Sequence, residues 1–356
     1  MPRRSKLWPN FPSSTASAAR GGDGKTPVGS LTHSGSTLYG VTGSGGAHGY
    51  GTTFRIETDG SGYKLLHSFE GPPGDGGTPL EGRLVQSGQT LYGTSYDGGA
   101  YNTGAIFRAD TDGMGYRLLH SLKPDNLLSL VFKSLHQKEG KGPHGFMALS
   151  GSTLYGTAEE WGPHNMGAIF RIDTDGGGYQ LLHSFGSVPN DGMAPHGLIL
   201  QGATLYGMTA MGGSHHHFGP AGNGTIFRID TGGADYRILH NFGSVSDDGM
   251  SPNGLILSGS TLYGTTGSGG DFRFGYGAGL PCGPQGNGAI FRIKTDGSEY
   301  QLIHSFDHGT GPWGSLTLAG TKLYGTTVKG GAYDSGTIFS FDVSLSGQGC
   351  PTSQPE

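Results

Sequence analysis

The sequence contains little charge, little cysteine and no long apolar run. Charged residues make up 14% of its 356 positions, and 22 basic against 27 acidic side chains leave a net charge of −5 at pH 7. No basic patch is therefore expected for a nucleic acid or an anionic membrane surface. Cys282 and Cys350 do not make a disulfide framework. No membrane span is expected, and no secretory signal is visible, because no apolar core follows the basic residues 1–6.

Glycine, in contrast, is abundant, with 72 residues at fixed places of a repeat. A Leu-Tyr-Gly signature returns at intervals of about 50 to 60 residues, a size typical of propeller blades. Its six copies begin at Thr37, Thr90, Thr153, Thr204, Thr261 and Lys322. Because the glycines keep their places in the repeat, we interpret them as turn residues rather than as a sign of disorder.

Each repeat predicts four short strands. An apolar run such as residues 254–257 is followed by the signature strand, as at 261–266. A glycine-rich loop leads to a third strand, as at 224–229, and an Asp-Gly turn leads to a fourth, as at 179–185. The sequence therefore predicts an all-β protein, a single six-bladed β-propeller of four-stranded blades.

The two ends of the chain predict how the ring closes. Residues 6–11 match the fourth-strand residues 64–69, whereas the sixth repeat stops after its third strand, 337–341. We expect the N-terminal strand to complete the last blade, since this leaves no unpaired edge. The predicted parts of this single domain are a closing strand at 1–12, blades at 27–69, 79–122, 143–185, 195–242, 252–306 and 312–343, and an inserted loop or lid at 123–142. Helical periodicity at 126–135 predicts a short helix within the insertion.

The pattern of Leu-Tyr-Gly-Thr-Thr, Gly-Thr-Ile-Phe-Arg, Leu-His-Ser-Phe and Asp-Gly-x-x-Pro resembles the GloVer tandem repeats, a choice-of-anchor type of repeat found in secreted or surface-anchored bacterial proteins. The resemblance covers nearly the whole chain. It implies a β-propeller and an extracellular or periplasmic location. It implies no particular reaction.

Polar residues that recur in every blade are expected to be structural. The fourth strands carry such a histidine, for which we expect a buried hydrogen bond between strands or to a loop; these are His67, His120, His183, His240 and His304. Aspartates that recur before glycine between blades are expected to form turns; these are Asp23, Asp75, Asp191 and Asp248.

The residue before the first-strand glycine differs from blade to blade, where GloVer repeats usually carry a small residue. The six residues are Val28, Glu81, His144, His196, Asn253 and Trp313. We expect them to face one another at the top of the central channel. Glu81, His144, His196 and Asn253 are the ligand types of a divalent ion such as Ca²⁺, Mn²⁺, Mg²⁺ or Zn²⁺, or of an acid/base cluster. Trp313 would offer a flat face to a sugar ring. Ordered water around these polar side chains is the alternative.

The variable loops between second and third strands are predicted to lie on the same top face, which favours a site there. Arg273 and Tyr276 are candidate catalytic residues, the arginine as the group that neutralises a carboxylate. Further substrate-binding candidates are Tyr101, Trp161, His164, His216 and Tyr333. For each aromatic side chain, packing at the rim is the structural alternative.

These residues favour an extracytoplasmic enzyme that acts on a carbohydrate or another polar small molecule, first as a lyase on an acidic sugar. A histidine or tyrosine would remove the proton beside a carboxylate held by a metal ion or Arg273. The alternatives are a metal-dependent, lactonase-like hydrolase and a propeller that binds a glycan or protein without catalysis. At most one divalent metal ion and no organic cofactor are expected.

Overall fold

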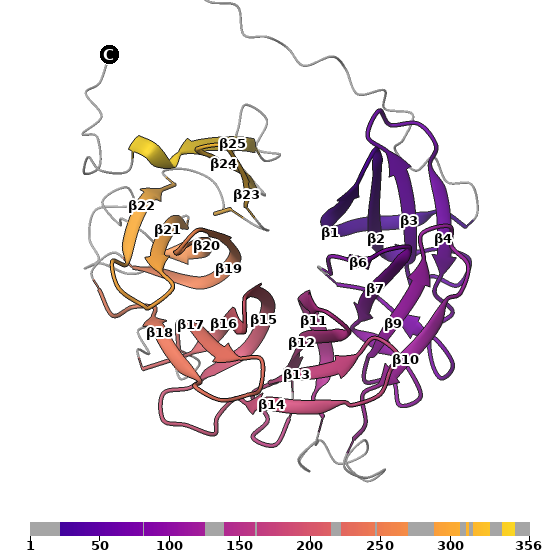
Figure 1. The fold of residues 1–356 in the computed structure, drawn as a ribbon, viewed down its shortest axis with the longest axis horizontal. Coiled ribbons are helices and arrows are strands. Elements are labelled where there is room, and N and C mark those ends of the chain that lie inside the picture. The colour runs from indigo at the N-terminus through magenta and orange to yellow at the C-terminus, as the bar shows by residue number, and fades with distance from the viewer. Residues whose placement is uncertain are drawn as a thin grey trace, which may run out of the picture.

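The computed structural model describes residues 22–80, 82–124, 139–160, 162–214, 222–245, 248–269, 288–306, 311–312, 316–327 and 337–345. These residues form six sheets arranged as blades around a central axis (Figure 1). Five blades have four strands each, and three strands of the sixth lie in the described ranges. The prediction of an all-β six-bladed propeller is confirmed. Within these ranges no helix has the length and hydropathy of a membrane span.

Each blade is a meander whose consecutive strands pair antiparallel, starting with the strand nearest the axis. Blade 1 contains β1 (Gly24–Ser34), β2 (Thr37–Gly45), β3 (Thr52–Glu57) and β4 (Lys64–Ser68). Blade 2 contains β6 (Val85–Ser87), β7 (Thr90–Ser95), β9 (Ala105–Asp110) and β10 (Arg117–Ser121), beside the short pair β5 (Gly76–Gly77) and β8 (Asp97–Gly98). Blade 3 contains β11 (Lys141–Ser150), β12 (Thr153–Glu160), β13 (Ala168–Asp173) and β14 (Gln180–Ser184). Blade 4 contains β15 (Gly192–Gln201), β16 (Thr204–Gly212), β17 (Thr225–Asp230) and β18 (Arg237–Asn241). Blade 5 contains β19 (Gly249–Ser258), β20 (Thr261–Gly269), β21 (Ala289–Lys294) and β22 (Gln301–Ser305). Blade 6 contains β23 (Thr317–Ala319), β24 (Lys322–Thr327) and β25 (Thr337–Asp342), followed by the 3-10 turn η3 (Val343–Leu345).

The Leu-Tyr-Gly signature has a packing reason. It occupies the second strand of each blade, where its glycine lies beneath a phenylalanine ring of the third strand. A Cβ atom at Gly93 would come within 2.4 Å of Phe107 Cζ, and one at Gly207 within 2.4 Å of Phe227 Cζ. Real side chains do not tolerate such distances, so only glycine allows the ring to fill this layer of the blade.

The hydrophobic core lies between successive blades. The phenylalanines that end the fourth-strand runs of blades 1, 3 and 4, Phe69, Phe185 and Phe242, are fully buried and pack edge-on against the third-strand phenylalanine of the next blade. Phe69 and Phe107 have ring centroids 5.1 Å apart, and Phe185 and Phe227 have centroids 5.4 Å apart. Each blade thus depends on its neighbour to bury its apolar faces.

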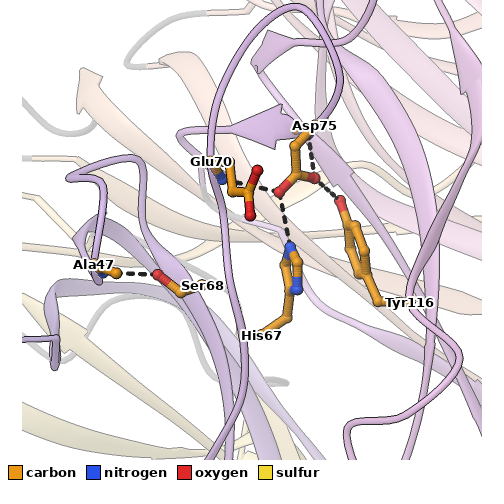
Figure 2. Close-up of polar contacts among 7 residues, drawn as sticks. Ala47, His67, Ser68, Glu70, Asp75 and Tyr116 are labelled. Carbon is orange, nitrogen blue, oxygen red and sulfur yellow. Dashed lines mark hydrogen bonds and ion pairs between the residues drawn. The ribbon is translucent and has the colours of Figure 1, made fainter.

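A polar contact accompanies this packing at the outer edge of the ring. Between blades 1 and 2, Nε2 of His67 donates to Oδ2 of Asp75 over 2.8 Å (Figure 2). The Tyr116 hydroxyl of blade 2 donates to Oδ1 of the same carboxylate, and its ring stacks on His67 at 3.5 Å between centroids. The amides of Glu70 and Gly76 also donate to this carboxylate. We call this histidine, acidic residue and tyrosine an inter-blade clamp.

The clamp recurs around the ring. Between blades 3 and 4 it consists of His183, Asp191 and Tyr236, and between blades 4 and 5 of His240, Asp248 and Tyr300. Between blades 2 and 3, Glu139 replaces the aspartate: it accepts from His120 Nε2 at 2.8 Å, and its backbone carbonyl accepts from Tyr179 at 3.1 Å. The predicted structural role of these histidines is confirmed. The aspartates do more than form turns, because their carboxylates join two blades.

The clamps make stability dependent on pH. Burial alone would raise the pKa of Asp75 and Asp191, but hydrogen bonds from the clamp histidine, the tyrosine and a backbone amide outweigh it and hold each pKa below its usual value. The pKa of Glu139 is lowered in the same way, chiefly by His120. The unfolded chain then binds more protons than the folded one at low pH. We expect the clamps to contribute completely to the free energy of unfolding at neutral pH. This free energy, measured by urea titration, is expected to fall as the pH is lowered from about 5 to 3. A free energy that stays constant over this interval would contradict the clamp's role.

Blade 6 lies next to blade 1 in the ring (Figure 1), and both blades carry exposed apolar side chains. Ile338 and Tyr324 of blade 6 are 83% and 39% exposed, and Leu31 and Tyr63 of blade 1 are 47% and 45% exposed. Leu84, which occupies the position of Leu31 in blade 2, is 2% exposed. The predicted closing strand at 6–11 and the predicted helix at 126–135 lie outside the described residues, so both stay predictions.

Candidate functional site

The variable position before the first-strand glycine lies at a β-bulge. The pairing of the innermost strand with the second strand shifts just after Val28, His144 and His196, and between Pro252 and Gly254. Gly145 and Gly197 follow with φ angles of 77° and 67°, which favour glycine. A bulge re-aims the side chain beside it, and such bulges are common next to functional sites.

The bulges surround a cavity of about 340 Å³ at the start of the innermost strands. His196 and Asn253 line it, together with Val28 and Phe146. We call it the upper cavity. Backbones meet closely beside it, since a Cβ atom at Gly145 would lie 2.4 Å from the Gly197 nitrogen. Two of the predicted site residues therefore share one cavity.

His196 also connects two blades. Its Nε2 donates to the carbonyl oxygen of Pro252 in blade 5 over 2.9 Å, and its Nδ1 lies 3.4 Å from the carbonyl oxygen of Ala194. Because carbonyl oxygens only accept hydrogen bonds, Nε2 carries a hydrogen here. In this arrangement Nε2 of His196 offers a ligand no lone pair, and its hydrogen is directed to Pro252.

His144 lies between His196 of blade 4 and Tyr96 of blade 2. Its ring is 6.4 Å from that of His196 and 6.5 Å from that of Tyr96, measured between centroids. Its Nδ1 lies 3.9 Å from Oε2 of Glu159, and its side chain is 15% exposed. An imidazole beside a carboxylate is the usual arrangement of a general base, so His144 is a candidate proton acceptor.

A second group of polar side chains adjoins His144 at the upper ends of β7 and β12. The Tyr96 hydroxyl donates to Oε1 of Glu160 over 2.6 Å, and Lys141 Nζ lies 3.5 Å from Oε2 of the same carboxylate. Lys141 Nζ also lies 5.6 Å from the centre of the Tyr96 ring. Burial, and then the hydrogen bond to Glu160, raise the pKa of Tyr96, so its hydroxyl keeps its proton. We call Tyr96, Lys141, His144, Glu159 and Glu160 the upper cluster.

Two other predicted residues that the structure describes, Tyr101 and His164, are not brought to the axis. Tyr101 follows Ala100, whose amide donates to Ser121 at the end of the outermost strand β10. The Cβ atom of His164 lies 2.9 Å from the Cβ position of Gly186, just past the outermost strand β14. Both residues therefore lie toward the outer rim. The remaining candidates lie outside the described residues; they are Glu81, Trp161, His216, Arg273, Tyr276, Trp313 and Tyr333.

A family model, the Gloeobacter/Verrucomicrobia repeat, matches residues 9–221, more than half of the chain. The chain belongs to this repeat family. The family prediction made from the repeated residues is thereby confirmed. A comparison with curated proteins finds no significant match.

Solved structures similar to this repeat protein are themselves propellers of low sequence identity. A GH74 enzyme from Niastella koreensis is 14% identical, with a TM-score of 0.53, over 86% of this chain and 44% of the enzyme. An oligogalacturonate lyase in complex with manganese is 12% identical, with a TM-score of 0.51, over 89% and 74%. A putative 6-phosphogluconolactonase from Bacteroides uniformis is 14% identical, with a TM-score of 0.50, over 89% and 85%. At these identities the likeness shows the fold alone.

In this member of the repeat family, the metal site stays a prediction. Of the four predicted ligands, His144, His196 and Asn253 gather at the upper mouth, and Glu81 lies outside the described residues. Within the described ranges, no three His, Cys, Asp or Glu side chains are grouped to hold an ion. An ion here would need Glu81 or the Asn253 amide, together with a His196 ring turned from its bond to Pro252.

The sequence analysis missed Tyr96 and Lys141. Tyr96 occupies the repeat position at which other blades carry Gly43, Ala210 and Gly267, so a tyrosine there breaks the repeat. It fits because Gly142 of β11 leaves room for the ring: a Cβ atom there would lie 2.4 Å from Tyr96 Cε2. The departure from the repeat could have been noticed, but the neighbour that receives the ring lies in the next blade and is not evident from spacing.

Proposed function

We propose that this protein is a carbohydrate-active propeller that cleaves an acidic sugar chain by β-elimination at the upper mouth. The observation that carries this is the upper cluster, in which a proton acceptor, a protonated hydroxyl and a cation lie together beside the upper cavity. The likeness to propellers described as a glycoside hydrolase and an oligogalacturonate lyase supports a carbohydrate substrate. The location we propose is extracellular or periplasmic, as the resemblance to GloVer repeats implied.

In this reaction His144, Lys141 and Tyr96 have different roles. His144 removes the proton from the carbon beside the sugar carboxylate, whose charge Lys141 offsets. Electrons of the broken C–H bond form a C=C bond as the bond to the glycosidic oxygen breaks. Tyr96, whose raised pKa keeps it protonated, donates its proton to that leaving oxygen. Water then reprotonates Tyr96 and takes the proton from His144, so no oxidant or reductant is needed. Arg273 and Tyr276 stay proposed contributors from outside the described residues.

The test is a pair of substitutions assayed on acidic oligosaccharides such as oligogalacturonates. Tyr96→Phe keeps the ring over Gly142 and removes only the hydroxyl, and His144→Ala removes the proton acceptor. Each is expected to lower kcat/KM by about 100-fold or more, measured by the ultraviolet absorbance of the unsaturated product. Tyr50→Phe, an equivalent change in a loop of blade 1, is the matched control and is expected to leave the rate unchanged.

The same assay separates the second candidate, metal-assisted hydrolysis, which the approach of His144 to His196 favours. Hydrolysis yields a saturated product, so cleavage without new absorbance would replace the lyase by a hydrolase. If acidic oligosaccharides bind to the wild type and none is cleaved, the protein is a glycan-binding propeller instead.

A further inference from the structure

The upper cavity is one half of a longer passage along the axis. A second cavity of about 1200 Å³ continues toward the opposite rim, and we call it the lower cavity. Ser30, Phe146, Ile199 and Leu255 line both cavities, so these residues mark the level at which the two join. A ligand held at the upper mouth can therefore extend into the lower cavity.

Among the described residues that line this passage, the one full charge is positive, opposite in sign to the net charge of the chain. Acidic residues outnumber basic ones by 27 to 22 in the sequence, yet none of the described residues that line either cavity is acidic. Arg83 and His33 line the lower cavity, and His196 lines the upper one. A passage lined by one sign of charge between low-dielectric walls attracts ions of the other sign.

Arg83 stands out among these side chains. It precedes β6, at the level at which the other blades carry Ser30, Phe146 or Leu255, all uncharged. Its side chain is exposed and makes no hydrogen bond or ion pair with any described residue. Most other described arginines bond a carboxylate, a carbonyl or an amide oxygen, as Arg108 does with Asp110. The Arg83 guanidinium therefore keeps its donors available in the passage.

We propose that Arg83 forms an anion-binding subsite at the junction of the two cavities and holds a carboxylate of an acidic carbohydrate chain. The guanidinium matches a carboxylate with two parallel hydrogen bonds. Phe146, Ile199 and Leu255, which line the junction, have apolar side chains, so they strengthen the charge interaction and offer a surface to the apolar face of a sugar ring. The choice of ligand rests on the function proposed above, whereas the subsite itself rests on the cavities and the charge.

The test measures binding by calorimetry with a trimer of galacturonic acid and, as its neutral counterpart, a trimer of galactose. Arg83→Met is expected to weaken binding of the acidic trimer about 10- to 100-fold, because a charge-assisted hydrogen bond is lost, and to leave the neutral trimer unaffected. Arg83→Lys keeps the positive charge but not the two parallel N–H donors of the guanidinium. Its affinity for the acidic trimer is expected to lie between those of the wild type and Arg83→Met. Arg117→Met removes an exposed arginine on the outermost strand of the same blade and is expected to change neither affinity.

The outcomes distinguish this subsite from the proposed reaction. If binding of the acidic trimer depends on Arg83 while no cleavage occurs, the subsite stands and the lyase function fails. If Tyr96→Phe abolishes cleavage while Arg83→Met binds the acidic trimer as tightly as the wild type, the function stands and the subsite is overturned. A wild type that binds no acidic trimer overturns the subsite. Because the Arg83 side chain is exposed, unchanged melting temperatures are expected to show that both Arg83 variants fold.

Discussion

Replacing Asp191 with alanine is expected to lower the free energy of unfolding by about 3 to 5 kcal/mol. The Asp191 carboxylate is 2% exposed and accepts hydrogen bonds from His183 at 3.0 Å and from the Tyr236 hydroxyl at 2.6 Å. The amides of Gly186 and Gly192 donate to it as well, both over 2.9 Å. Alanine would leave these donors buried without an acceptor at the junction of blades 3 and 4. Urea unfolding at pH 7 measures the change.

Two further variants show whether the loss comes from the clamp. Tyr236→Phe removes one donor and keeps the stacked ring, so a smaller loss of about 1 to 2 kcal/mol is expected. Asp175→Ala removes an aspartate of a tight turn, where the carboxylate accepts only from the Gly177 amide at 2.8 Å, and should cost less than about 1 kcal/mol. Equal losses for Asp191→Ala and Asp175→Ala would show that the clamp carries no special stability.

Deleting residues 1–12 is expected to lower the melting temperature by about 10 °C or more. We propose that residues 6–11 pair with β25 and complete blade 6, because they repeat the fourth-strand sequence at 64–69. The deletion would then remove Leu7, Trp8 and Phe11 from packing and leave β25 as an open edge. Burial of three such side chains contributes about 5 kcal/mol or more.

A shorter deletion provides the control for this experiment. Removing residues 1–5 alone leaves the proposed closing strand complete and is expected to change the melting temperature by no more than about 2 °C. Differential scanning calorimetry compares the two deletions with the full chain. An unchanged melting temperature after removal of residues 1–12 would exclude ring closure by this segment.

The fold was predictable because the same residue types pack in the same way in every repeat. Leu-Tyr-Gly and the third-strand phenylalanine form one layer, and their recurrence identifies the blades without any structure. The clamp was only half predictable. His183 and Asp191 stand out by recurrence, but their bonding depends on Tyr236, which reaches them from the next blade.

The site was less predictable for a geometric reason. The residue before the first-strand glycine marked the correct level of the channel, and His196 and Asn253 do line the upper cavity. His144 occupies the same repeat position but does not line that cavity, and its ring lies between those of His196 and Tyr96, at 6.4 and 6.5 Å between centroids. Spacing along the chain also placed Tyr101 and His164 near the site, whereas their loops fold toward the outer rim.

The clamps lie at the outer edge of the ring and the bulges of the innermost strands lie at the axis, and the two sets have no residue in common. Selection can therefore change the residue before the first-strand glycine in one blade and leave every clamp in place, although at His196 the bond to Pro252 of the next blade would be lost. A gene with six identical copies would preserve the clamps and lose the mixture of side chains at the mouth. After duplication of the repeat, substitutions at this one position in each copy can thus change the ligand that the propeller binds while the fold is kept. The same position is the natural target for directed evolution.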